Sequence, residues 1–283
     1  MADSSKAVLI TGCSTGIGRA TAERLVASGH SVYATARRLE SIADLEAKGC
    51  KLLALDVTDE DSMRAAVAAV EQAEGAVGAL INNAGYSQSG AVESLDLDAV
   101  RRQFETNVFG LVRMCQLVLP GMRRQRYGRI VNISSIGGKL VFPGGGAYHA
   151  TKHAVEAFSD ALRFEVKGFG VDVVIVEPGL IKTEFATAAT TALDAGTTDE
   201  GPYARFNEAV GAATLGAYEG PAAMLGGGPD KVARAIEKAI DSRRPKIRYK
   251  VTPSAHIVLR QRALFTDRMW DRFVGTQFPR PRA

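Results

Sequence analysis

Three polar residues, Ser135, Tyr148 and Lys152, have types and spacings that suit proton transfer. Tyr148 and Lys152 are four residues apart in AYHATKHAVEAFSDALRFEV, a run that predicts a helix with both side chains on one face. A free phenol titrates near ~10, and an ammonium group one turn away favours the phenolate by attraction. Ser135 closes a strand-like run, and the glycine-rich loop after it can fold back toward the same substrate oxygen. The trio suits a carbonyl or alcohol substrate.

A glycine-rich turn near the start of the chain predicts a dinucleotide site. The apolar run at residues 6–11 predicts a buried parallel strand that leads directly into GCSTGIG. Glycines where a strand joins a helix permit positive φ and let backbone N–H groups approach a phosphate. The first gap between glycines is longer than in the usual GxGxxG pattern, and structural glycines would give the same signal.

The next predicted strand, residues 31–36, is followed by Arg37 and Arg38. NAD-binding folds commonly place an acidic residue there, facing the ribose 2′-hydroxyl, whereas an arginine can pair with a 2′-phosphate. The local chemistry therefore favours NADP over NAD. The alternative is a pair of solvated arginines at the start of a helix.

Four further apolar runs, 50–57, 77–85, 128–135 and 171–179, together with the segment 244–251, predict strands that alternate with helices along almost the whole chain. Asp56 lies at the C-terminal end of the first of these, and its position favours a hydrogen bond to an adenine amine. The second ends in small or amide-bearing residues that allow a cofactor to approach closely.

Three helices of the pattern carry specific expectations. The first spans about residues 39–48 and ends at Gly49, and the second begins with Thr58 as its cap. The third spans about residues 97–122 and contains Asn107, an unusual residue for a helix interior unless its amide has a partner or the helix is locally distorted.

Composition limits the possible classes of protein. The chain has 283 residues, 46% of them apolar, enough for one large α/β domain or two small ones. No apolar run reaches the roughly 18–20 residues of a membrane helix, and no signal-peptide core is present, so we expect a cytoplasmic protein without an integral membrane segment. Cys13, Cys50 and Cys115 have unrelated spacings and no companion histidines, which predicts reduced core thiols and no metal site.

Positive charge is concentrated near the end of the sequence. Residues 241–283 contain eleven Lys or Arg and three Asp, which gives this segment a formal charge of +8. The rest of the chain carries −4, so the whole chain has a formal net charge of +4. A basic segment of this kind can meet an acidic partner or a membrane surface, or it can be a solvated face. We expect no nucleic-acid partner.

Together, TGCSTGIG, NNAG, Asn107, Ser135, YHATK and PGLIKT resemble the short-chain dehydrogenase/reductase superfamily in their order and spacing, from about residue 6 to residue 251. The resemblance implies a doubly wound, Rossmann-type parallel sheet in a single α/β domain over residues 1–283. It also places a substrate lid at about residues 184–228, before the last strand.

The same resemblance implies roles for individual residues. Tyr148 is the general acid/base, Ser135 orients the reacting oxygen, Lys152 lowers the tyrosine pKa and holds the nicotinamide ribose, and Asn107 anchors a water. The implied cofactor contacts are Gly12, Ser14, Gly16, Ile17 and Gly18 at the pyrophosphate, Asp56 and Val57 at the adenine, Asn83, Ala84 and Gly85 at the cofactor floor, and Pro178, Gly179, Ile181 and Thr183 over the nicotinamide. Thr15 replaces the basic residue of many NADP-preferring members, so the NADP preference depends mainly on Arg37.

The segments VYATARR and PKIRYKVTP are most similar to the branch that acts on hydroxysteroids, retinoids and related lipophilic alcohols. We therefore expect an NADP(H)-dependent oxidoreductase that interconverts a ketone and a secondary alcohol on a bulky, mostly apolar substrate. The alternatives are a reductase of a polar or acyl-thioester carbonyl and a catalytically silent NADP-binding regulator. We also expect a homodimer or homotetramer formed through the helices that contain Asn107 and Tyr148.

Overall fold

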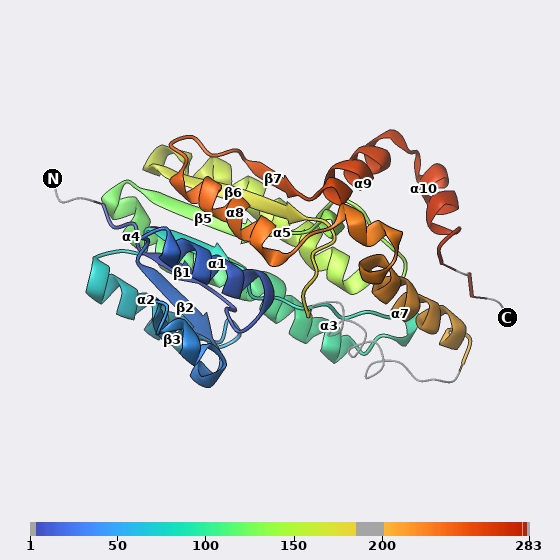
Figure 1. Cartoon of the computed structure of the whole chain (residues 1–283), viewed down its shortest axis with the longest axis horizontal. Coiled ribbons are helices and arrows are strands. Elements are labelled where there is room, and N and C mark those ends of the chain that lie inside the picture. The colour runs from blue at the N-terminus through green and yellow to red at the C-terminus, as the bar shows by residue number, and fades with distance from the viewer. Residues whose placement is uncertain (1–3, 185–200, 279, 282–283) are drawn as a thin grey trace.

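Seven strands form one entirely parallel sheet in the computed structural model of the chain (Figure 1), which describes residues 4–184, 201–278 and 280–281. The strand order is β3-β2-β1-β4-β5-β6-β7, so the order reverses between β1 and β4. This arrangement confirms the doubly wound, Rossmann-type sheet, in which ligands bind at the carboxyl ends of the strands near the reversal. The strands are β1 (Val8–Ile10), β2 (Val32–Ala36), β3 (Lys51–Ala54), β4 (Ala79–Asn82), β5 (Gly128–Ile133), β6 (Val171–Pro178) and β7 (Arg248–Val251).

Two separate apolar layers cover the faces of the sheet. On one face, Val8 and Ile10 pack against α1 (Gly16–Ala27) and α8 (Pro229–Asp241). On the other face, Leu9 belongs to the cluster that includes residues of α2 (Glu60–Glu74), α4 (Leu111–Gln125) and α5 (Gly146–Glu165). Successive residues of a strand point to opposite faces, so strands covered on both sides must be apolar throughout, as the sequence pattern predicted. Cys13, Cys50 and Cys115 are buried free thiols, which confirms their predicted role in the core.

The local structure corrects two of the helix predictions. The segment predicted as a helix over residues 39–48 forms the 3₁₀-helix η1 (Leu39–Leu45), although Gly49 does adopt the left-handed backbone, with φ +100°. The cap of α2 is Asp59, whose carboxylate accepts from Ser62 N at 3.0 Å. Thr58 instead donates its hydroxyl to Asp56 Oδ1 at 2.8 Å, so its side chain is already engaged outside the helix.

The long helix predicted over residues 97–122 is interrupted. It consists of α3 (Leu97–Phe104), a π-helical turn η3 (Glu105–Gly110) and α4, which continues to Gln125. The remaining short 3₁₀ segments are η2 (Val92–Ser94), η4 (Ile136–Gly138), η5 (Lys167–Phe169) and η6 (Pro221–Leu225).

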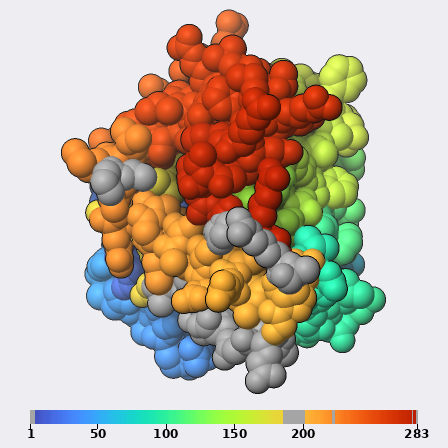
Figure 2. Space-filling view, turned by 90° about the vertical axis from the view of Figure 1, so that its right-hand side faces the viewer, coloured from blue at the N-terminus to red at the C-terminus, as the bar shows by residue number. Residues whose placement is uncertain are grey.

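The C-terminal helices cover one end of the molecule. Figures 1 and 2 show α9 (Pro253–Leu264) and α10 (Asp267–Val274), coloured red, beside α7 (Ala204–Glu219). Trp270 and Leu259 pack with Leu140, so both helices rest on the loop that follows β5. No helix among the described residues has the length and apolar character required to cross a bilayer.

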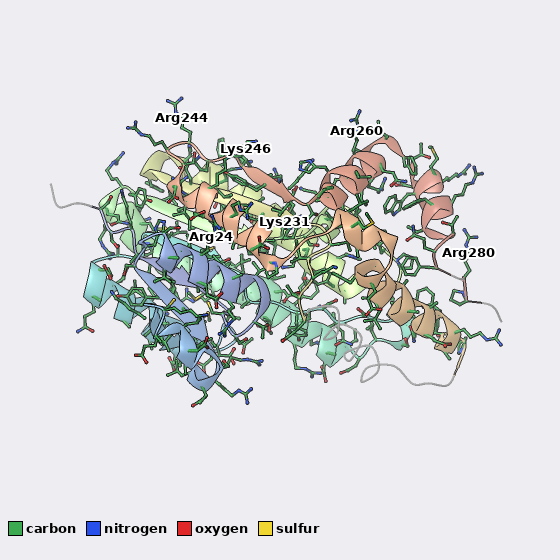
Figure 3. All side chains as sticks on the ribbon, in the orientation of Figure 1. Arg24, Lys231, Arg244, Lys246, Arg260 and Arg280 are labelled. Carbon is green, nitrogen blue, oxygen red and sulfur yellow. The ribbon has the colours of Figure 1, made fainter. Side chains whose placement is uncertain are left out.

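The basic C-terminal segment divides into outward and inward side chains. Arg244, Lys246 and Arg260 point away from the body of the protein (Figure 3). Arg248 and Arg262 instead form ion pairs with acidic residues, Arg248 at 2.6 Å from Asp160 and Arg262 at 2.7 Å from Asp267. Part of the predicted positive surface is therefore neutralised within the fold.

Candidate active site

Ser135, Tyr148 and Lys152 meet at the carboxyl end of β5. Ser135 precedes the short helix η4, and its hydroxyl accepts from Gly137 N at 3.0 Å. Helix α5 carries Tyr148 and Lys152 in its first two turns, and Lys152 Nζ lies 5.8 Å from the centroid of the Tyr148 ring. The lysine also donates to the Ile133 carbonyl at 2.8 Å, which ties the helix to the end of the strand. The structure thus brings together the three side chains that the sequence analysis singled out.

Burial controls the acidity of these groups. Desolvation raises the pKa of the Tyr148 phenol above its usual range, and a hydrogen bond with Ser135 opposes this rise. The sequence predicted that Lys152 lowers this pKa. In the structure that effect is not resolved, since the ammonium group is directed at the Ile133 carbonyl and burial dominates. Burial also lowers the pKa of Lys152 to about 8.

Asn107 lies in the π-helical turn with both ends of its amide engaged. Its Nδ2 donates to Tyr86 O at 2.9 Å and to Thr151 Oγ1 at 3.1 Å, and its Oδ1 accepts from Tyr86 N at 3.1 Å. Both explanations that the sequence left open, a partner for the amide and a local distortion, are therefore present. A Cβ at Gly85 would lie 3.0 Å from Asn107 Oδ1 and 3.8 Å from Lys152 Nζ, so a side chain at this position would crowd the Asn107 amide.

The turn between β1 and α1 has the backbone geometry that a phosphate site requires. Gly12 and Gly16 have φ of +74° and +57°, in the left-handed region that favours glycine. A Cβ at Gly18 would lie 2.2 Å from Gly12 O, which no other residue could tolerate. Helix α1 begins at Gly16, and its cap Thr15 makes no side-chain bond to the first-turn N–H groups. These donors at a helix N-terminus suit a pyrophosphate. Of the other predicted contacts in the turn, Ser14 is exposed and Ile17 packs against the core.

The ends of β1 and β4 are joined by side chains. Asn83 Nδ2 donates to Thr11 O and to Gly12 O, both at 2.9 Å. Thr11 Oγ1 accepts from Asn83 N and Ala84 N, both at 3.0 Å. Thr11 was not among the predicted site residues. A polar residue at the end of the run over residues 6–11 was the available signal.

The predicted adenine-side residues lie at the ends of β2 and β3. Arg37 is exposed and takes part in none of the ion pairs found among the described residues, while its charge acts on the Tyr86 phenol beyond β4. Asp56 uses Oδ1 to accept from Thr58 N at 2.9 Å. Val57 is buried, and a Cβ at Gly110 would lie 2.4 Å from its carbonyl oxygen.

The segment after β6 returns to the glycine turn. A Cβ at Gly16 would lie 3.3 Å from Thr183 Cγ2, so these two residues are in contact across the site. Ile181 pairs with Gly227 in an isolated parallel bridge, and a Cβ at Gly179 would meet Ser254 Oγ at 2.4 Å. Pro178, at the end of β6, begins this segment. The predicted nicotinamide cover is thus held between the glycine turn and the base of α9.

His149 is a further residue of the site that the sequence analysis missed. A Cβ at Gly137 or Gly145 would lie 2.5 or 2.4 Å from its ring, so the glycine-rich loop closes around the imidazole. Burial lowers the pKa of His149 to about 4, which keeps the ring neutral at pH 7. The glycines at both ends of the loop were the signal for a bulky side chain between them.

The sequence and the fold were compared with those of known proteins. A family model described as short chain dehydrogenase matches residues 6–194. A solved short-chain dehydrogenase from Streptomyces avermitilis is 37% identical, with a TM-score of 0.75 over 92% of this chain and 93% of that one. A serine dehydrogenase complexed with NADP+ is 28% identical, with a TM-score of 0.75 over 87% of this chain and 94% of that one. A 3-ketodihydrosphingosine reductase of Bacteroides thetaiotaomicron is 45% identical over 63% of this chain and 65% of its own length.

Proposed function

The chain belongs to the short-chain dehydrogenase/reductase family of oxidoreductases, and from that premise we propose that it uses NADP(H) to interconvert a ketone and a secondary alcohol on a bulky, mostly apolar substrate. The observation that carries the proposal is the meeting of Ser135, Tyr148 and Lys152 beside the glycine turn at the carboxyl edge of the sheet. Proton donors and a phosphate-binding turn at one edge are what a hydride-transfer enzyme needs.

In the reductive direction, Tyr148 donates its proton to the substrate oxygen, and Ser135 holds the same oxygen by a hydrogen bond. When bound, NADPH would supply the hydride. Lys152 holds the nicotinamide ribose and places a positive charge near the phenol, while Asn107 anchors a water beside it. The raised pKa of Tyr148 keeps the phenol protonated at neutral pH, which supports the role of acid and hence reduction.

Three features support NADP as the cofactor. Arg37 stands exposed where an acidic residue would select NAD, and its guanidinium is available for a 2′-phosphate. The glycines of the turn and the N–H groups at the start of α1 suit the pyrophosphate of such a cofactor. The NADP+ complex of the related serine dehydrogenase adds to the case. We also propose that Asp56 and Val57, just after the end of β3, form the adenine pocket.

The segment over residues 184–228 is proposed as the substrate lid. Its part over residues 185–200 lies outside the described residues. In the remainder, α7 packs on the loop before α5, because a Cβ at Gly144 would lie 2.5 Å from Val210 Cγ1. Tyr218 of α7 influences the pKa of Tyr148, and Tyr203 and Phe206 form an edge contact with centroids 6.4 Å apart. The aromatic side chains of the proposed lid support a lipophilic substrate, as does the relative named for 3-ketodihydrosphingosine.

We extend the proposal to organisation. The whole chain is one catalytic domain with this lid, and it self-associates through the helices that bear Asn107 and Tyr148. A cytoplasmic location stays a prediction from the sequence.

NADPH oxidation across a panel of ketones tests the function. We expect long-chain, steroid or retinoid-like ketones to be reduced faster than small polar ones, and Tyr148→Phe to lower the rate by roughly 100-fold or more, as loss of a general acid does. Tyr127→Phe is the matched control, since it removes a phenol just before β5, at the opposite end of that strand from Ser135. Equal activity of Tyr148→Phe and the unaltered enzyme would disprove the mechanism.

Ionic strength separates the alternatives. An acyl-thioester substrate on an acidic carrier, bound by the basic C-terminal segment, would show a KM that rises steeply with salt, whereas apolar binding would not. NADPH binding without turnover on any carbonyl would instead identify a silent regulator.

A further inference from the structure

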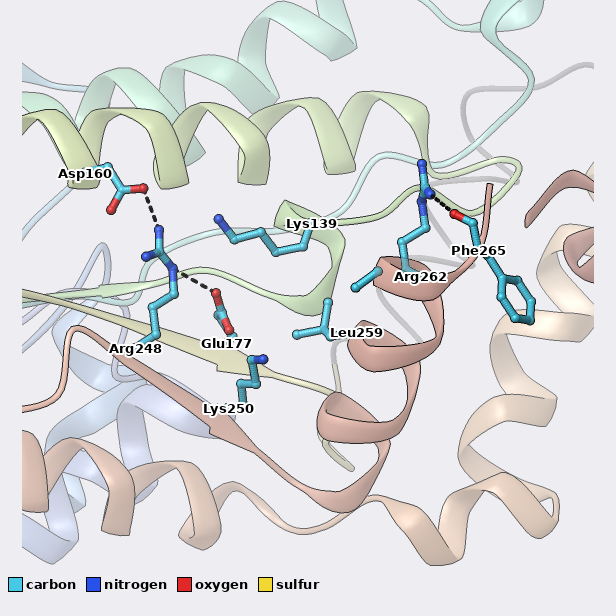
Figure 4. A pocket seen from close by; sticks show the side chains of 9 residues that line it. Lys139, Asp160, Glu177, Arg248, Lys250, Leu259, Arg262 and Phe265 are labelled. Atoms are coloured by element: carbon cyan, nitrogen blue, oxygen red, sulfur yellow. Dashed lines mark hydrogen bonds and ion pairs between the residues drawn. The ribbon is translucent and has the colours of Figure 1, made fainter. Parts of the chain in front are cut away.

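A charged groove lies behind the catalytic helix, between α5, the ends of β6 and β7, and α9 (Figure 4). It has a volume of about 690 Å³. Its apolar wall comes from α9, and its other walls carry charges of both signs. The lining residues are Lys139, Asp160, Glu177, Arg248, Lys250, Leu259, Arg262, Ala263 and Phe265.

Glu156 lies buried between this groove and the reacting groups, with 4% of its surface exposed. Its Oε2 accepts from Arg248 Nη2 at 3.0 Å and lies 2.8 Å from Lys139 Nζ. Its Oε1 is buried with no hydrogen-bond partner among the described atoms. Lys139 and Arg248 therefore hold this carboxylate oxygen in place inside the protein.

Lys152 precedes Glu156 by one turn of α5, so the two side chains share a face of the helix. Both are buried, and this part of α5 packs closely against Gly138 of η4. A Cβ at Gly138 would lie 2.9 Å from Glu156 Cγ and 3.0 Å from Lys152 O. Burial makes the charged form of Lys152 costly, and the carboxylate of Glu156 acts in the opposite direction.

We infer that Glu156 is a positioning residue for the reaction: its buried carboxylate, fixed by Lys139 and Arg248, keeps Lys152 in the ammonium form. The inference rests on the proposed function, in which Lys152 acts as a cation. It links β7 to the active site, because Arg248, on β7, binds the Glu156 carboxylate.

Two further acidic residues, Asp160 and Glu177, contact the same arginine. Asp160 Oδ2 accepts from Arg248 Nη2 at 2.6 Å, and Glu177 Oε1 lies 3.2 Å from Arg248 Nε. Glu177 is fully buried, and burial together with Glu156 raises its pKa. Lys250, in the groove, acts to lower it. Lys152 itself is faced by the Tyr148 ring and the Ile133 carbonyl, so Glu156 is the one acidic side chain among the described residues that acts on its pKa.

Glu156→Gln keeps the shape and removes the charge. The pKa of Lys152, about 8 with Glu156 present, should fall by about one unit for a pair in a medium of intermediate dielectric. Activity requires protonated Lys152, so the decline of kcat/KM with rising pH should begin about one pH unit lower. The variant should be about three-fold slower at pH 7.5 and nearly unchanged at pH 6, since both forms are then protonated.

Asp160→Asn is the matched control, because it also removes a carboxylate from Arg248 but lies a further turn away from Lys152. It should leave the pH profile in place. Glu156→Asp retains the charge and should keep the basic limb within a few tenths of a pH unit of the unaltered enzyme. Unmoved limbs in Glu156→Gln, or equal shifts in Glu156→Gln and Asp160→Asn, would overturn the inference.

The pH dependence of NADPH binding, followed by cofactor fluorescence, gives a second readout that does not need turnover. Affinity should fall at a pH about one unit lower in Glu156→Gln, because Lys152 holds the ribose. An enzyme that binds NADPH with this shift but reduces no carbonyl would refute the proposed function and leave the inference about Glu156 standing. Active enzyme without the shift would do the reverse.

Discussion

Burial sets opposite requirements on the two residues that the proposed reaction uses most. It raises the pKa of Tyr148, which keeps the phenol as an acid, and it lowers the pKa of Lys152 to about 8, which weakens the charge meant to assist it. Neighbouring side chains oppose both shifts: Ser135 lowers the pKa of Tyr148, and Glu156 raises the pKa of Lys152. Sequence spacing shows that Tyr148 and Lys152 share a helix face, but it contains no information on desolvation, so the direction of the tyrosine shift required the structure.

At the same scale, Arg37 decides the choice of cofactor. A charge-assisted pair between one guanidinium and a 2′-phosphate contributes roughly 1.5–3 kcal/mol. Arg37→Ala should therefore weaken NADPH binding by about one to two decades and leave NADH binding nearly unchanged. Fluorescence titration with both cofactors measures the ratio.

Arg38→Ala is the natural control for this experiment, since it removes an equally exposed arginine from the adjacent position. The assignment fails if Arg37→Ala leaves the ratio of the two affinities as it is in the unaltered protein, or if Arg38→Ala changes that ratio by more.

At the scale of elements, the sequence pattern predicted every strand of the sheet. Apolar runs located the central strands, because a strand covered on both faces must be apolar along its length, whereas the edge strands β3 and β7 each carry an exposed lysine. The motifs also located the ends of β1, β4, β5 and β6 where polar groups gather. The sequence pattern gave the wrong local structure where two alternatives differ little in free energy. The choice between an α-helix and the 3₁₀-helix η1, and between Thr58 and Asp59 as the cap, depends on which local hydrogen bond wins. The Glu156–Arg248 contact joins residues 92 positions apart, which periodicity does not address.

Helix α10 also has a predicted role, which is to hold the loop after Ser135. Trp270 Nε1 donates to Val141 O at 3.1 Å, and its ring lies 5.6 Å from that of Phe142, which in turn lies 6.3 Å from His149. Trp270→Ala should lower the free energy of unfolding by about 3–5 kcal/mol, if the site cannot collapse. Because the loop lies next to the phenol, KM for the ketone should rise more than the Kd for NADPH.

Denaturant unfolding measures the first effect and steady-state kinetics the second. Met269→Ala, on the exposed side of the same helix, should change stability by no more than about 0.5 kcal/mol. If Trp270→Ala kept full stability and unchanged kinetics, α10 would not support the loop after Ser135.

For the whole molecule, the distribution of exposed apolar surface is the feature with the largest consequence. The solvent-facing stripe of α5 follows helical spacing and has no Asp, Glu, Lys or Arg: Ala150, His153, Ala157, Ala161 and Phe164. Phe164 is 84% exposed, and Phe109, in the neighbouring π-helical turn, is 53% exposed. A surface helix whose outer face is small and apolar is typical of a helix that packs against another protein surface.

We therefore expect a dimer or tetramer in solution at micromolar concentration, with α5 of one copy packed against the same helix of another, as a two-fold interface requires. Ala157→Glu places a charge at the centre of the stripe, where two copies would bring like charges together, and should shift the mass in light scattering toward the monomer. Leu264→Glu, which adds the same charge at an exposed apolar position on α9, should not. If the unaltered protein were monomeric, or if all three proteins had equal masses, the stripe of α5 would face solvent. The catalytic residues on the inner face of that helix would then be held by the chain's own core alone.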